Sequence, residues 1–132
     1  MDNLNPTPIE AEIKRDALLM VIIHGAILGL WYLMWIWIVP IVGELFNGLL
    51  GQFPTDLQFV LNTCEFLRSH SLVVVFSAAA LLFLDRRYYS HLHRRYGVCK
   101  ATRWSFGVSL ILLAFTAANL WWVFSTCTRY LF

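Results

Sequence analysis

His24 is the first candidate for chemistry, because it lies alone inside the uncharged stretch IIHGAILGLW. An ionisable residue within an apolar segment of membrane length is a functional-site hypothesis by default. A neutral imidazole could ligate a haem iron or the magnesium of a chlorin, and Gly25 and Gly29 would leave room for a flat ring. The alternative, which we favour, is a neutral histidine bonded to a backbone carbonyl or a neighbouring helix. We therefore predict no cofactor. If a haem or chlorin is bound, His24 is the residue that would ligate it.

The remaining reactive side chains give weaker signals. His91 and His93 are two residues apart, so on a helix they face different directions, and we predict no metal site. Cys64 and Cys127 are expected on the same side of a membrane, either as buried free thiols or as a disulfide, and Cys99 is expected to be reduced. No Ser/His/Asp set, glycine-rich phosphate loop or close carboxylate pair is visible in the sequence. The sequence therefore predicts a protein that is not an enzyme.

The elements that must position these residues are long and apolar. The chain has 132 residues, of which 59% are hydrophobic and 14% charged, whereas soluble domains carry about 25% charged residues. Uncharged blocks cover 17–39 and 104–124, long enough to cross a bilayer. A third block, 71–84, has only 14 uncharged residues and would cross by borrowing a turn at each end, from Phe66-Leu67 and Tyr88-Tyr89; a re-entrant segment is the alternative. We predict an all-α integral membrane protein with three transmembrane helices.

The basic residues predict the orientation. Eight of the ten lysines and arginines lie in segments 1–16 and 85–103, which three spans would place on one side. By the positive-inside rule these segments are the cytoplasmic N-terminus and a basic cytoplasmic loop, and 125–132 is an external C-terminus. Arg86, Arg87, Arg94 and Arg95 are candidates for contact with anionic lipid headgroups; a topology signal alone is equally compatible. We expect no nucleic-acid binding from a loop held at the membrane.

Segment 40–70 predicts an external amphipathic helical hairpin. Pro40 disfavours helix at Val39, so the first span is expected to kink or end there. The apolar stripe that follows has helical spacing and would bury against the membrane or a partner; it contains Ile41, Val42, Leu45, Phe46, Leu49 and Leu50. The chain would turn at 51–54, from a Gly51 C-cap to Pro54. A capping box of Thr55 and Gln58 would then start the second helix.

Small residues indicate where helices approach closely. Gly25 and Gly29 form a small-xxx-small step in the first span, and Ser77, Ala78 and Ala80 form a small-residue face in the second. Three helices alone would leave much aromatic surface uncovered. We therefore expect partners, either other membrane subunits or further copies of the chain, together with lipids.

Residues 22–87 resemble the F-protein family, the inner-membrane platforms of type II secretion and type IV pilus machines. The resemblance lies in an ordered set of motifs: Val39-Pro40, Glu44, Phe46, Gly51, Phe53-Pro54, Glu65-Phe66-Leu67 and Arg86-Arg87. Leu57 stands where the family usually has threonine. The short segments before the first span and between the later two do not contain the family's large cytoplasmic domains. The resemblance implies a truncated, scaffold-like member in a bacterial inner membrane.

Two functions remain open at this point. The first is a small non-catalytic multi-pass scaffold or assembly subunit. The second is an accessory subunit of a larger energy-transducing or photosynthetic complex, contacting a cofactor or lipid at its edge.

Overall fold

The described residues, 7–50 and 55–129 of the computed structural model, are helical almost throughout. This confirms the all-helical prediction and supports a membrane protein. The elements are α1 (Pro8–Leu33), the π-helical turn η1 (Met34–Ile38), α2 (Val39–Leu50), α3 (Thr55–Ser69), α4 (Ser71–Tyr96) and α5 (Val98–Thr128).

Two of these helical stretches are long and apolar enough to cross a membrane, namely Pro8–Gly48 and Val98–Thr128. A third crossing exists if α3 and α4, which meet at a bend of 76°, form one broken span. The middle segment is thus the least suited of the three predicted spans to cross by itself, which agrees with its short uncharged block at 71–84.

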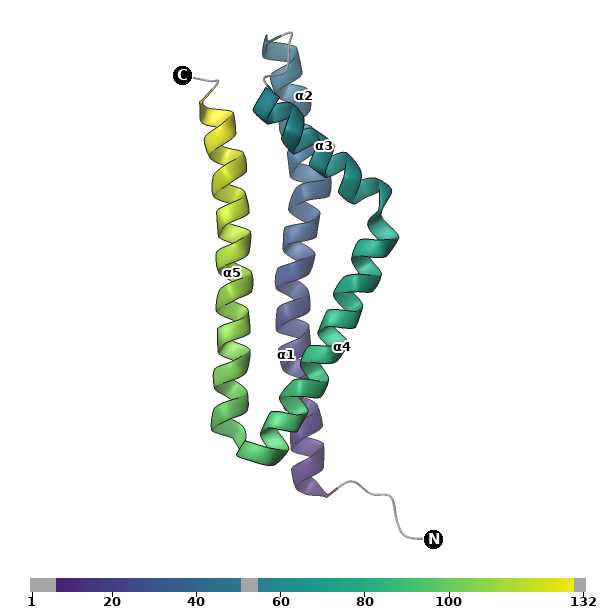
Figure 1. Ribbon diagram of the computed structural model, residues 1–132, viewed down its shortest axis with the longest axis vertical. Helices are drawn as coiled ribbons and strands as arrows, with labels where there is room; N and C mark the ends of the chain where they lie inside the picture. The colour runs from purple at the N-terminus through teal and green to yellow at the C-terminus, as the bar shows by residue number, and fades with distance from the viewer. Residues whose placement is uncertain (1–6, 51–54, 130–132) are drawn as a thin grey trace.

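Figure 1 shows α1, η1 and α2 as one long column, with α5 running beside it in the same direction and α4 running the opposite way. α3 folds back from the end of α2, and α4 then crosses α1 obliquely on its way to α5. α1 packs against both α4 and α5, which also contact each other. α4 therefore touches the column near the basic end of the molecule and diverges from it towards the hairpin.

The basic end is more regular than predicted. Pro8 takes the first turn of α1, where its missing N–H does no harm, and Thr7 Oγ1 accepts from the Glu10 backbone N–H at 3.4 Å. The segment predicted as a loop, 85–103, is helical except at Gly97. That residue has φ +84°, which glycine adopts without steric cost. One residue thus reverses the chain between α4 and α5.

Pro40 does not end the helix at Val39; the irregularity lies just before it, in η1. The Val39 N–H donates to the Met34 carbonyl, five residues back, instead of to Trp35. The next donor along, at Pro40, does not exist, because proline has no N–H. The widened turn leaves the Trp35 carbonyl without a backbone donor, a common consequence of π-bulges in otherwise regular helices.

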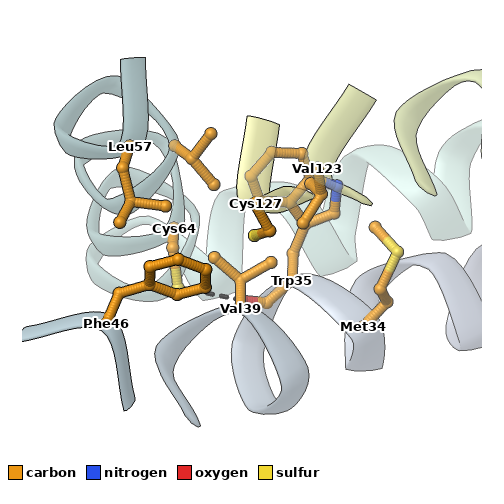
Figure 2. Packing of buried hydrophobic residues seen from close by; sticks show 9 residues of the cluster. Met34, Trp35, Val39, Phe46, Leu57, Cys64, Val123 and Cys127 are labelled. Atoms are coloured by element: carbon orange, nitrogen blue, oxygen red, sulfur yellow. Dashed lines mark hydrogen bonds between the residues drawn. The ribbon is translucent and has the colours of Figure 1, made fainter. Parts of the chain in front are cut away.

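Cys64 fills this gap. Its Sγ–H donates to the Trp35 carbonyl oxygen at 2.9 Å, which joins α3 to the irregular turn (Figure 2). A buried apolar cluster from η1, α2, α3 and α5 surrounds the bond; it contains Met34, Trp35, Val39, Phe46, Leu57, Val60, Cys64, Val123 and Cys127. Cys64 and Cys127 are both free thiols, so the structure contains no disulfide between them.

The hairpin stripe divides between two faces. Phe46 is 5% exposed and packs inward, whereas Ile41 and Leu45 are 56% and 62% exposed and point away from the chain. Gly43 lies directly against Leu61 of α3, where a Cβ would meet Leu61 Cδ2 at 2.5 Å. The face of α2 that contacts α3 therefore contains Gly43 and Phe46, and Leu45 lies on the other face. Thr55 begins α3, with Gln58 exposed in its first turn; Gly51 and Pro54 lie outside the described residues.

Cys64→Ala should destabilise the hairpin more than Cys64→Ser. Alanine leaves the Trp35 carbonyl buried without a donor, which costs about 1–3 kcal/mol, while serine retains one. Unfolding in mixed micelles, followed by tryptophan fluorescence, measures the difference.

Cys127 is the matched control, because it lies in the same cluster and its thiol forms no hydrogen bond to another helix within residues 7–50 and 55–129. At Cys127, serine should have no advantage over alanine. An equal serine advantage at both positions would mean that the bond to Trp35 contributes nothing.

Candidate functional site

The candidate site is a polar contact where α1, α4 and α5 meet. His24 of α1 is 1% exposed. Its Nδ1 lies 2.6 Å from Asp85 Oδ2 on α4, and its Nε2 lies 3.0 Å from Ser109 Oγ and 3.3 Å from the Ser105 carbonyl oxygen on α5. One side chain thus joins three helices.

Asp85 is held on its second oxygen as well. Trp104 Nε1–H donates to Asp85 Oδ1 at 3.2 Å, and the Trp104 ring meets the Tyr88 ring edge-on at 4.8 Å between centroids. The Asp85 side chain is only 15% exposed, so its carboxylate is largely buried between the helices. Both oxygens are bonded, as a carboxylate in an apolar environment requires.

The pattern of partners restricts the proton positions on His24. Carboxylate oxygens only accept, so Nδ1 carries the hydrogen shared with Asp85. In a neutral ring Nε2 then accepts from the Ser109 hydroxyl. In a charged ring Nε2–H donates to Ser109 or to the Ser105 carbonyl. Either state leaves both ring nitrogens satisfied.

Ser109, His24 and Asp85 therefore form a set that the sequence did not predict. No such set is visible in the sequence, because the three residues are far apart along the chain; the structure brings them to 3.0 and 2.6 Å, within the hydrogen-bond reach of a nucleophile–base–carboxylate arrangement. Hydrolysis also needs an oxyanion hole and access to the nucleophile. Ser109 lies in the middle of α5, where backbone N–H groups are committed to the helix, and it does not line the neighbouring groove.

That groove lies beside His24, between α4 and α5, and has a volume of about 510 Å³. It is open on one side and its exposed wall is almost wholly apolar; the residues that line it include Leu28, Leu81, Trp104, Val108 and Leu112. A flat cofactor could lie in such a groove. Axial ligation by His24 would first require Nε2 to give up its contacts with α5.

The predicted packing residues separate into two groups. Gly25 faces α4, where an added Cβ would touch Leu82 Cδ1 at 3.5 Å, and Ala78 is half-buried. Gly29, Ser77 and Ala80 are exposed. Only the first group is used within the chain, because α4 has already diverged from α1 at the level of Gly29.

The remaining candidates lie on the basic end of α4 and beyond. Arg86, Arg87, Arg94 and Arg95 are exposed, and so is Cys99. His93 is 8% exposed while His91 is exposed, so the two histidines point in different directions, as expected. No group of three or more His, Cys, Asp or Glu side chains that could hold a metal occurs within 7–50 and 55–129.

Sequence reasoning missed Asp85, which it assigned to the start of a loop. Asp85 is the last acidic residue in the sequence and directly follows the apolar block ending at Leu84. A lone carboxylate at the end of an apolar block was the available signal. Nothing in the sequence indicated that Asp85 pairs with His24, because that pairing depends on the position of α4 along the axis of α1.

Comparison of the chain with protein-family models, with curated proteins and with solved structures gives no match.

The His24–Asp85 contact should show energetic coupling. His24→Ala and Asp85→Ala should each destabilise the chain, and the double variant should cost less than their sum by about 0.6–1.7 kcal/mol, the range for polar contacts between membrane helices. Titration of the purified chain from mild detergent into SDS, followed by circular dichroism, provides all four free energies of unfolding.

His70→Ala is the control, since His70 is exposed and bonds only within its own turn. Its effect should stay within about 0.5 kcal/mol. Strict additivity of the His24 and Asp85 variants would contradict the coupling.

Proposed function

We propose that the chain is a small non-catalytic multi-pass membrane scaffold, an assembly subunit that binds other membrane proteins or further copies of itself. The observation that carries this proposal is the use of its buried polar groups. His24 and Asp85 bond to each other and to α5, and so hold the chain's own helices together. Binding surface for partners is instead supplied by side chains that face outward.

The α2–α3 hairpin offers the most distinctive of these surfaces. Its inner face is packed against η1 and α5. On α2, Ile41 and Leu45 are 56% and 62% exposed beside the polar Glu44. On α3, Phe59 and Phe66 are also exposed, although the Phe59 ring meets Trp122 of α5 edge-on. A mixed apolar and polar face on a firmly seated hairpin suits contact with a protein partner better than contact with lipid alone.

The sequence resemblance supports the same function. The motifs shared with secretion and pilus platform proteins cover this hairpin and the helices on either side of it. We place the N-terminus and the basic ends of α4 and α5 in the cytoplasm of a bacterial cell, with the hairpin on the external side of the inner membrane.

A second candidate is an accessory subunit of an energy-transducing or photosynthetic complex. The open apolar groove beside His24, bordered by Tyr88 and Trp104, favours it. In that function the groove would hold the edge of a cofactor or lipid belonging to the larger complex.

Photo-crosslinking in native membranes tests the scaffold. Benzoylphenylalanine at Leu45, which is 62% exposed on the hairpin, should give protein adducts. The same probe at Ile111, 70% exposed midway along α5, should react with lipid only. Adducts are resolved by electrophoresis and identified by mass spectrometry. Monomer alone at both positions would overturn the proposal.

Ser109 should not react with a fluorophosphonate probe in native membranes. The probe labels serines that are activated as nucleophiles and accessible. Ser109 does not line the groove, and the backbone N–H groups around it are committed to α5, so no oxyanion hole lies beside it. Gel fluorescence gives the readout, with a serine hydrolase added to the same membranes as a positive control. Labelling that disappears in Ser109→Ala would establish an acyl-transfer site and contradict a purely structural function.

A further inference from the structure

α4 carries two chemically different halves along one face. Residues 76, 80, 83, 87, 91 and 94 recur every three or four positions, so they lie in one row on the helix. In the first half the row is apolar, with Phe76 and Phe83 exposed by 72% and 62%. In the second half the row becomes basic, beginning at Arg87. A row that is apolar along one half and cationic along the other has the pattern of a membrane lipid with an anionic headgroup.

A shallow pocket lies where the two halves meet. Its volume is about 430 Å³, and it is lined by Phe83, Arg86, Arg87, Ser90, His91 and Arg94. The hydroxyl of Ser90 donates to the Arg86 carbonyl, so this hydroxyl is held against its own helix. The three guanidinium groups are therefore the main donors facing the pocket.

The charge of these arginines is poorly compensated within the chain. Asp85 precedes them, but its carboxylate is bonded to His24 and Trp104 inside the helix contact. Among the described residues, no carboxylate lies within 4.0 Å of Arg86 or Arg87. Arg94 and Glu10 are 4.0 Å apart and both largely exposed, a geometry that contributes little. The pocket thus retains an excess of positive charge.

We propose that this pocket binds a lipid headgroup that carries two phosphate groups, with the acyl chains along Phe83 and Phe76. Arg87 and Arg94 are seven residues apart, about 10 Å along the helix. That separation suits two phosphates held at either end better than one phosphate held by both. Guanidinium groups bind phosphate oxygens through paired N–H donors. Arg95 stands outside the site, because its guanidinium lies 5.5 Å from the Tyr96 ring centroid and does not line the pocket.

Native mass spectrometry of the full chain in detergent, titrated with diphosphatidylglycerol, tests the site. Arg87→Gln and Arg94→Gln should each weaken binding about fivefold, from about 1 kcal/mol per basic residue near an anionic membrane surface. Arg95→Gln removes the same charge from the same helix and should weaken binding less than twofold. Equal losses at Arg87 and Arg95 would show diffuse charge attraction and overturn the proposal.

Two further titrations separate the sources of phosphate. Phosphatidylglycerol, supplied at twice the molar concentration to match charge, should bind more weakly than diphosphatidylglycerol. Inorganic pyrophosphate should not displace the bound lipid at equal concentration, because it cannot contact Phe83 and Phe76. Equal binding of the one-phosphate lipid would overturn the claim that the site holds two phosphates. Displacement by pyrophosphate would overturn the claim that the ligand is a lipid.

Discussion

The contact between His24 and Asp85 determines how the helices are arranged. Between helices in lipid, burying one apolar surface against another gains little, because the acyl chains are equally apolar. Specific geometry then comes from polar contacts and from close approach of small residues. Both occur together here: the 2.6 Å bond lies next to a tightly packed level where Ala17 and Ala101 are fully buried beside Tyr89. With this crossing fixed, the rest of α4 can diverge from α1. The groove lies at the crossing itself, lined in part by His24 and Asp85, and the arginine pocket lies on α4 alone.

A second polar bond determines the other end of the molecule. Pro40 supplies no N–H, and the π-helical turn before it leaves the Trp35 carbonyl available. Cys64 takes that carbonyl, and α3 is thereby seated on the column formed by α1 and α2. A backbone irregularity thus becomes the point where α3 binds the column. The same principle therefore applies at both ends of the helix bundle. A polar group that has no hydrogen-bond partner within its own helix bonds to a neighbouring helix instead.

The sequence predicted the helices well, because uncharged length and proline are local signals. It placed the irregularity at Val39-Pro40, although η1 lies up to five residues earlier, since a helix can absorb the missing donor upstream of the proline. It treated 85–103 as a loop, because charge density resembles a loop when helical spacing is not considered. It therefore missed Asp85 as a partner of His24, and the contacts of His24 with Ser105 and Ser109 in the third block were not predicted either. Asp85 and Ser105 stand at the ends of their apolar blocks, whereas His24 stands seven residues inside its own, so matching residues by depth would not have paired them.

The same offset explains how an ionisable pair is tolerated at this position. The apolar part of α1 begins at Ala17, but the charged part of α4 begins at Asp85, level with His24. About 10 Å of α1 therefore lies beside the basic ends of α4 and α5. Apolar side chains of α1 are exposed over this length; they are Leu18, Leu19, Ile22 and Ile23.

No single flat membrane boundary can therefore separate the apolar from the charged residues on all three helices. Long arginine side chains and the rings of Tyr88 and Trp104 are the groups that accommodate such a mismatch, because they extend from apolar depth to the headgroups. His24 and Asp85 consequently lie near the boundary of the apolar layer, where ionisable groups cost less than at its centre, and their bonds to Ser109 and Trp104 satisfy their remaining polar atoms.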